Sequence, residues 1–142
     1  MIDFTCDYSE GAHPAILERL VDTNFEQTPG YGEDRYCQAA REKIRTRCGD
    51  VDVHFLVGGT QANLTVIAFL LKPWQGVLCA DTGHINQHET GAIEATGHKV
   101  LSLPSRDGKI TATQVEQAVR EHQADATHEH RVQPGMVFIG SP

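Results

Sequence analysis

The chain has 142 residues, of which 39% are hydrophobic, and this length and composition allow one buried core. Its formal net charge of −7 argues against a general nucleic-acid binder, because such proteins need a basic face for the phosphate backbone. The amino terminus has no apolar run of signal length, and the longest apolar stretch, residues 64–71, is too short to span a bilayer. We therefore expect a cytoplasmic protein with no membrane and no nucleic-acid partner.

Two helices are predicted before residue 50. Residues 14–21 carry apolar side chains at the spacing of three and four residues that one helix face requires. Residues 34–47 predict a second helix, with Gly49 just beyond its end. The basic face of this second helix is interpreted as solvated, and contact with a partner or an anion is the alternative.

A strand followed by a helix is predicted in the next segment. Residues 51–57 are β-branched and aromatic with partial alternation, which predicts a strand. Residues 64–71 are apolar nearly all round and are followed by Pro73, which predicts a helix that ends before this proline. We expect this helix to begin near Thr60.

The junction between this strand and helix is the first candidate site. Gly58 and Gly59 let the backbone approach a ligand closely, and the free N–H groups of a first helical turn favour an anion. We predict that the N–H groups of Gly59, Thr60 and Gln61 bind a phosphate or a similar anion. The alternative is a tight turn in which Thr60 is an ordinary N-cap.

A second candidate site follows the short apolar strand predicted at residues 76–80. This strand leads into a loop that contains His84, and ligands of open parallel sheets bind at the carboxyl ends of the strands. We therefore expect His84 to lie at the same sheet end as Thr60, with Glu89 nearby. The alternatives are a surface or helix-entry role for His84 and an exposed first-turn carboxylate for Glu89.

The remaining elements alternate between helices and strands. They are a helix at residues 88–95 closing at Gly97, a strand at 99–103, a turn at Asp107 and Gly108, a helix with a Thr113 and Glu116 capping box through about Glu121, and a strand at 136–139.

Metal sites and disulfides are not predicted. The four cysteines have no C-x-x-C spacing and lie in unrelated segments, so we expect reduced thiols, with Cys79 buried in its strand. A zinc hypothesis arises from imidazole and carboxylate groups near residues 122–130. Their spacing does not match a helical i, i+4 pair, and a solvated linker is the preferred interpretation. This polar group consists of His122, Asp125, His128, Glu129 and His130.

Several stretches together resemble the amino-terminal part of a known family. The most specific is the run from Gly59 to Leu64, Gly-Thr-Gln-Ala-Asn-Leu. The chain resembles low-specificity threonine aldolases, within the β-eliminating lyase group of fold-type I pyridoxal-phosphate enzymes. The other matching stretches, in order, are Met1-Ile2-Asp3-Phe4 with Asp7, Gly11-Ala12-His13-Pro14, Tyr31-Gly32-Glu33-Asp34, and His84-Ile85 with Glu89 and Gly91-Ala92.

The resemblance implies a fold and an assembly. The fold would be α/β, part of a three-layer α/β/α large domain with a mostly parallel sheet, and residues 1–142 would form the amino-terminal part of that domain. Residues 1–20 would include an amino-terminal arm or helix. The cofactor would be pyridoxal 5′-phosphate, the partner an amino-acid substrate, and the assembly a homodimer or homotetramer.

The resemblance also implies roles for individual residues. Gly59, Thr60 and Gln61 would bind the cofactor phosphate. His84 would stack on the pyridine ring and act as a base or water-positioning group toward the substrate hydroxyl. Glu89 would orient His84 or a water molecule, so His84 and Glu89 are the candidate catalytic residues.

Three residues are candidates for substrate binding. Cys6 stands where the family commonly has a serine that helps to hold the substrate carboxylate, and Asp7 follows it. Tyr31 matches a position near the partner subunit's active site, and the alternative is a tyrosine packed in a Pro-Gly-Tyr-Gly turn. Because a thiol is a weaker donor than a hydroxyl, another β-hydroxy amino acid or a related lyase reaction stays open.

The lysines bear on the activity of this chain alone. The family's Schiff-base lysine and the aspartate that pairs with the pyridine nitrogen arise well downstream of the histidine. A Schiff-base lysine needs a loop of small residues, and none of the four lysines has one. Lys43 lies in a helix-like segment, Lys72 just before a proline, Lys99 at the start of a strand and Lys109 in a turn. We therefore expect a fragment of a longer enzyme, inactive by itself. A self-standing binding or assembly module that retains a phosphate site is the alternative.

Overall fold

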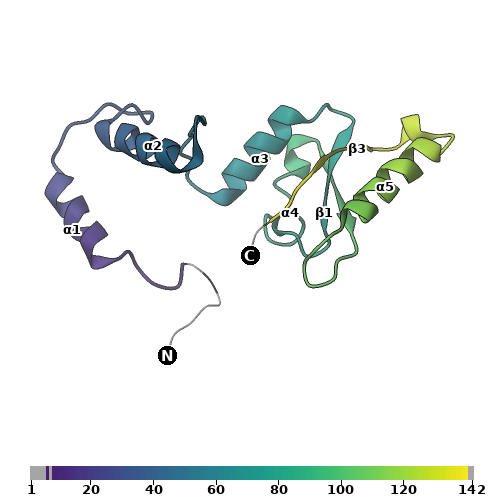
Figure 1. The fold of residues 1–142 in the computed structure, drawn as a ribbon, viewed down its shortest axis with the longest axis horizontal. Helices are drawn as coiled ribbons and strands as arrows, with labels where there is room; N and C mark the ends of the chain where they lie inside the picture. The colour runs from purple at the N-terminus through teal and green to yellow at the C-terminus, as the bar shows by residue number, and fades with distance from the viewer. Residues whose placement is uncertain (1–5, 7, 141–142) are drawn as a thin grey trace. The chain divides into compact units, whose positions relative to one another are not determined.

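The computed structural model describes residue 6 and residues 8–140, which divide between two compact units, Met1–Phe55 and Leu56–Pro142 (Figure 1). The first unit contains α1 (Pro14–Thr23) and α2 (Arg35–Cys48). Both helices have local start signals: Pro14 is the first residue of α1, and the Asp34 side chain accepts hydrogen bonds from the first turn of α2. Neither helix has a buried residue.

The second unit is built on a parallel sheet. Its strands are β1 (Gln75–Ala80), β2 (Lys99–Leu103) and β3 (Gln133–Val137), in the spatial order β2-β1-β3, and both pairings are parallel. The helices are α3 (Gly59–Leu70), α4 (His84–Gln87) and α5 (Ala112–Ala124), with 3-10 turns η1 (Glu94–Thr96) and η2 (His128–His130). The predicted α/β class with a mostly parallel sheet is confirmed.

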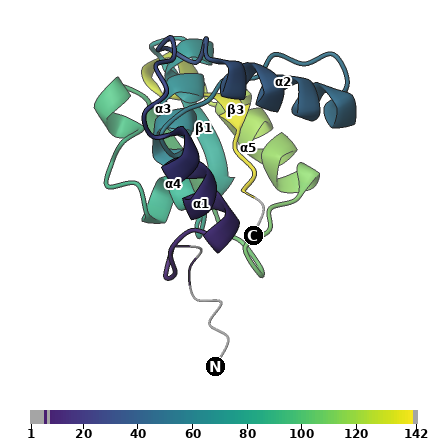
Figure 2. The same cartoon turned by 90° about the vertical axis from the view of Figure 1, so that its left-hand side faces the viewer.

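Helices cover both faces of this sheet (Figures 1 and 2), as the alternation of side chains along β1 requires. Val77 and Cys79 are fully buried in a cluster with Ile67 of α3, whereas Leu78 lies on the opposite face with Ala118 of α5. The core cluster consists of Ile67, Leu71, Val77, Cys79, Ile85, Ile93 and Val100. The predicted burial of Cys79 is therefore confirmed.

Burial changes the chemistry of the Cys79 thiol. Loss of solvation, and to a smaller extent the nearby Asp81 and Glu94 carboxylates, raises the pKa of Cys79 to about 11. The central strand is also tightly packed at Gly76, where an added Cβ would lie 2.6 Å from the carbonyl oxygen of Lys99. The sheet unit thus has a close-packed centre at β1.

The strand predicted at residues 51–57 is wrong. This segment has no strand, because among the residues described no other segment forms a hydrogen-bonded ladder with it. β-Branched and aromatic residues favour an extended backbone, but a strand also needs a partner.

Two predicted helix positions also differ. The prediction of a helix at residues 88–95 is wrong, because Thr90 (φ 50°) and Gly91 (φ 76°) are left-handed and interrupt it. The 3-10 turn η1 follows and ends, as predicted, at Gly97. The predicted capping box lies two residues earlier, at Thr111 and Gln114. Among the residues described, no helix combines the length and apolar character needed to cross a membrane.

Candidate active site

The amino terminus of α3 presents unpaired backbone donors. Its N-cap is Gly58, which has no side chain, so the alternative of Thr60 as N-cap is wrong. The Ala62 N–H donates to the Gly58 carbonyl at 3.1 Å, whereas within the described residues no acceptor lies at the N–H groups of Gly59, Thr60 and Gln61. These three donors at a helix start can hold an anion.

The geometry around these donors leaves room for a ligand. A Cβ added at Gly58 or Gly59 would meet no atom within 4 Å, so the surface is open there. The Gln61 side chain turns back, and its Oε1 accepts the Val57 N–H at 3.0 Å. The Gln61 side-chain oxygen therefore holds the chain entering α3, and the Gln61 backbone N–H stays available to a ligand.

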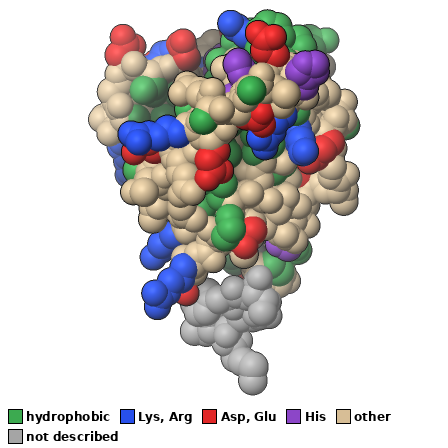
Figure 3. Space-filling view, turned by 90° about the vertical axis from the view of Figure 1, so that its right-hand side faces the viewer, with side chains coloured by type: hydrophobic (Ala, Val, Ile, Leu, Met, Phe, Trp, Pro, Cys, Tyr) green, Lys and Arg blue, Asp and Glu red, His purple; other side chains and the backbone are tan. Residues whose placement is uncertain are grey.

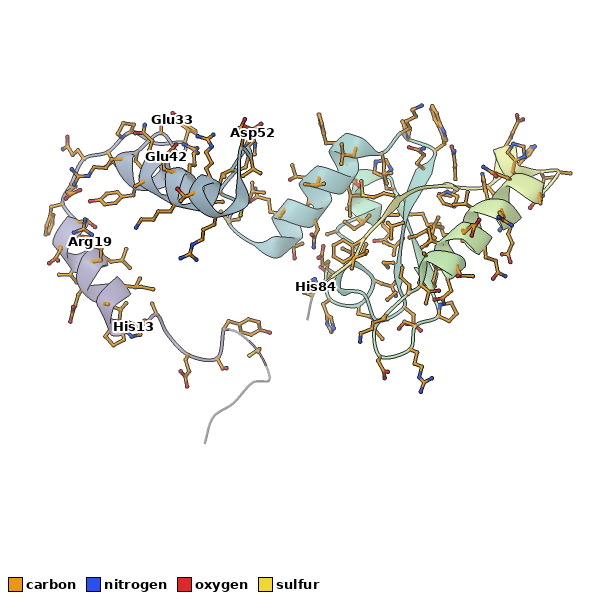
Figure 4. All side chains as sticks on the ribbon, in the orientation of Figure 1. His13, Arg19, Glu33, Glu42, Asp52 and His84 are labelled. Carbon is orange, nitrogen blue, oxygen red and sulfur yellow. The ribbon has the colours of Figure 1, made fainter. Side chains whose placement is uncertain are left out.

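His84 is placed by a tight turn after β1. The Gly83 N–H donates to the Ala80 carbonyl at 2.8 Å, and a Cβ at Gly83 would lie 2.9 Å from that same oxygen. His84 then opens the short helix α4, with its side chain 56% exposed (Figure 4). The Asn86 side chain donates to the Asp81 carbonyl at 2.8 Å and holds the turn closed.

Glu89 is buried beside this histidine. Its side chain is fully buried, so the alternative of an exposed first-turn carboxylate is wrong. Its Oε1 lies 2.8 Å from His84 Nδ1 and accepts a hydrogen bond from Asn63 Nδ2 at 2.6 Å. Its Oε2 is buried and has no hydrogen-bond partner in the described part of the chain. These contacts place the amino-terminal half of α3 beside the loop that follows β1.

A second carboxylate ties this loop to the one after β2. Asp81 Oδ1 accepts hydrogen bonds from the Ser105 hydroxyl, the Ser105 N–H and the Thr82 N–H. These donors, the Ser105 hydroxyl first, lower the pKa of Asp81. Asp81 therefore stays ionised and fixes the base of the loop that carries His84.

The candidate substrate-binding residues belong to the first unit. Tyr31 has a left-handed backbone (φ 61°) and a fully exposed side chain, so the alternative of a packed tyrosine is wrong. Arg41 holds the adjacent turn by donating to the Gly32 carbonyl at 2.8 Å. Cys6 is partly buried, and Asp7 lies outside the described residues. Their roles toward a substrate stay predictions.

The polar stretch near residues 122–130 is organised by local contacts. The His122 and His128 rings meet edge to face, with centroids 5.7 Å apart, and Arg131 pairs with Asp125 at 2.7 Å. Figure 3 shows histidine side chains among charged ones on this face. In the residues that the structure describes, no three histidine, cysteine or carboxylate side chains group as metal ligands.

Sequence reasoning missed two residues of the site. In the sequence Asn63 stands out only as a part of the Gly-Thr-Gln-Ala-Asn-Leu run, yet it lies one helical turn after Gly59 and contacts Glu89. His88 has its ring centroid 5.5 Å from that of His84. The signal for Asn63 is its position, because an amide four residues after a helix start can face the same ligand end as the free N–H groups.

Comparisons with known proteins agree with this arrangement. A family model described as beta-eliminating lyase matches residues 3–139. Low specificity L-threonine aldolases from Pseudomonas sp. (strain NCIMB 10558) and Pseudomonas aeruginosa are each 28% identical over 123 residues, covering 84% of this chain and 36% of the relative. A solved structure of Leishmania major threonine aldolase matches with a TM-score of 0.86 and 45% identity, covering 94% of this chain and 38% of that one. The chain thus spans only 36% of the length of these curated relatives.

Proposed function

The chain belongs to the beta-eliminating lyase family, and from this premise we propose that it supplies the phosphate-binding and histidine-bearing part of a pyridoxal-phosphate-dependent aldolase. The reaction is cleavage of a β-hydroxy amino acid to glycine and an aldehyde. The observation that carries the proposal is the Glu89 carboxylate, which joins His84 to the helix whose first three N–H groups have no acceptor within the described residues.

The phosphate of the cofactor fits the start of α3. Gly59, Thr60 and Gln61 offer three N–H donors, and open space surrounds Gly58 and Gly59. The positive end of the helix dipole adds about 0.3–1 kcal/mol for an anion at an exposed terminus. When bound, pyridoxal phosphate supplies an electron sink to the amino-acid substrate.

His84 accepts the proton of the substrate hydroxyl. Its Nδ1 faces Glu89, and its side chain is more than half exposed, so its Nε2 is the nitrogen available to a ligand. A neutral imidazole with Nδ1 as the donor can accept a proton at Nε2. Glu89 stabilises the charge that this transfer creates on the ring.

The substrate class is a small amino acid with a hydroxyl on its β-carbon. Cys6 and Tyr31 are proposed to contact this substrate, with Tyr31 serving the site of a partner subunit in a homodimer or homotetramer. The fully exposed Tyr31 side chain supports this role, because aromatic side chains are enriched in protein–protein interfaces. Cys6 favours a second candidate, β-elimination from a different amino acid, because its thiol is a poorer donor to a carboxylate.

The test is a direct assay of the full protein that carries this chain. With pyridoxal phosphate added, we expect a visible absorption band and release of glycine and an aldehyde from β-hydroxy amino acids. Release of ammonia and the 2-oxo acid with the carbon skeleton of the substrate, without glycine, would favour the second candidate, and no absorption band would contradict both.

A substitution tests the role of His84. His84→Phe keeps an aromatic ring but removes the proton acceptor, and we expect kcat to fall about 10²–10⁴-fold while the absorption band remains. His130→Phe is the matched control, because His130 lies in η2, which precedes the amino end of β3. Equal turnover by the His84→Phe variant and the wild type would contradict the role.

A further inference from the structure

The Glu89 carboxylate uses one oxygen for two donors. Oε1 faces Asn63 Nδ2 at 2.6 Å and His84 Nδ1 at 2.8 Å, while Oε2 is buried without a partner in the described residues. Because an amide nitrogen only donates hydrogen bonds, Oε1 acts as an acceptor toward Asn63. A carboxylate oxygen can accept a second hydrogen bond, so the 2.8 Å contact fits a hydrogen carried on His84 Nδ1.

The Glu89 side chain is fully buried. The two residues after it are left-handed, with φ 50° at Thr90 and 76° at Gly91, so the chain turns directly after the carboxylate. A buried carboxylate is stable only where donors compensate for its lost hydration. Oε2 has no partner in the described part of the chain, so Asn63 and His84 are the two side chains there that contact the carboxylate within hydrogen-bond distance.

We propose that Asn63 is a positioning residue for His84: by donating to Glu89 Oε1, it holds the carboxylate so that His84 carries its hydrogen on Nδ1 and presents an unprotonated Nε2. The proposal deepens the proposed function and rests on it for the use made of Nε2. Asn63 also lies on the first turns of α3, so the helix that offers its N–H groups to a phosphate sets the state of the histidine.

The first experiment measures the tautomer of His84 without activity. The full protein, free of ligand and labelled with ¹⁵N-histidine, is examined by NMR at a pH where imidazole is neutral, and His84→Gln assigns the resonances. In the wild type we expect Nδ1–H to be favoured at least about tenfold, as a hydrogen bond to a charged group allows. In Asn63→Ala we expect the two tautomers to come within about threefold of each other.

Two further variants keep this experiment decisive. Asn86→Ala is the matched control, because it also removes an asparagine side-chain hydrogen bond in the His84 loop but does not touch Glu89. Gln87 donates to the same Asp81 carbonyl at 2.8 Å and keeps the turn closed, so we expect the wild-type tautomer. Asn63→Leu branches at Cγ as asparagine does and favours a helix, so it replaces Asn63→Ala if that variant fails to fold. The proposal is overturned if the folded Asn63 variant keeps the wild-type tautomer, or if wild-type His84 carries its hydrogen on Nε2.

Measuring turnover distinguishes a failure of the Asn63 proposal from a failure of the proposed aldolase function. With cofactor and a β-hydroxy amino acid, we expect Asn63→Ala to lower kcat about tenfold with little change in KM, as partners behind a reacting group do. Loss of the tautomer preference together with unchanged kcat would overturn the link to His84 chemistry. If the wild type releases no glycine, the proposed function fails, while the tautomer result still decides how Asn63 acts on His84.

Discussion

The two units differ in what their helices bury. Each residue counted as buried among those described lies in the sheet unit, from Ile67 to Val100, whereas α1 and α2 have none. In α1 the apolar face stays open, with Leu17 at 51% and Val21 at 73% exposure. Capping and spacing therefore suffice to start a helix, but only the parallel strands bring enough apolar surface together to form a core.

The same difference applies to the candidate site. Asn63, His84 and Glu89 hold one another within the sheet unit, through contacts of 2.6 Å and 2.8 Å. Tyr31 and Cys6 lie in turns and loops of the first unit. The candidate catalytic residues thus have fixed positions in the unit that has the hydrophobic core, because packing fixes side chains that an exposed loop leaves free.

The largest expected effect compares one core residue with one exposed residue. Ile93 is fully buried, so Ile93→Ala should lower the free energy of unfolding of the sheet unit by about 2–5 kcal/mol. Leu17→Ala in α1 should change it by less than about 0.5 kcal/mol, because that side chain is half exposed. Urea unfolding followed by amide exchange at β1 measures both. Equal effects would show that α1 shares a core with the sheet.

Cysteine labelling compares the units more finely. At pH 8 a thiol of pKa about 11 is ionised to about one part in a thousand, so Cys79 should react with iodoacetamide very slowly. The exposed Cys48 in α2 should be labelled at least about a hundredfold faster. Peptide mass spectrometry gives both rates in one sample. Comparable rates would mean that β1 opens as readily as the first unit.

A smaller effect locates the anion within the sheet unit. Proline is tolerated at the first position of a helix and removes one N–H, so Gly59→Pro should weaken phosphate binding about tenfold. Gly59→Ala keeps the N–H, and its added Cβ meets no protein atom within 4 Å, so it should weaken binding less than Gly59→Pro does. Titration with pyridoxal phosphate, with the absorption band as readout, compares the three proteins. Equal affinity for proline and alanine variants would place the phosphate elsewhere.

Local signals in the sequence predicted most of the elements. The periodicity and end signals of α2 and the apolar run of β2 led to the right elements, since each depends on residues close in the chain. The strand at residues 51–57 failed because pairing depends on a distant partner. The helix at residues 88–95 failed because a left-handed threonine carries no strong signal in sequence.

The candidate site was predictable to a different extent. The resemblance pointed to Gly59, Thr60, His84 and Glu89 from their motifs. Sequence reasoning left the burial of Glu89 open, because burial arises from packing between α3 and the loop after β1. The contact with Asn63 spans 26 residues, and no local pattern encodes such a separation.

The smallest expected effect is a pH dependence confined to the sheet unit. Hydrogen bonds from Ser105 and Thr82 lower the pKa of Asp81 in the folded state, so the unfolded chain binds the proton more tightly. The stability from these bonds is therefore present above the unfolded pKa, about 3.9, and is lost as the pH falls through the lower folded value.

Asp81→Asn keeps an oxygen acceptor but cannot titrate, so its unfolding midpoint should fall less between about pH 5 and pH 2.5 than that of the wild type. Asp125, whose pKa is also lowered, chiefly by Thr127, titrates in both proteins and cancels from the difference. Urea midpoints at each pH, read from amide exchange at β1, give the two slopes. Parallel slopes would mean that the Asp81 bonds form in the unfolded chain as well, and that the loops beside His84 owe their geometry to packing alone.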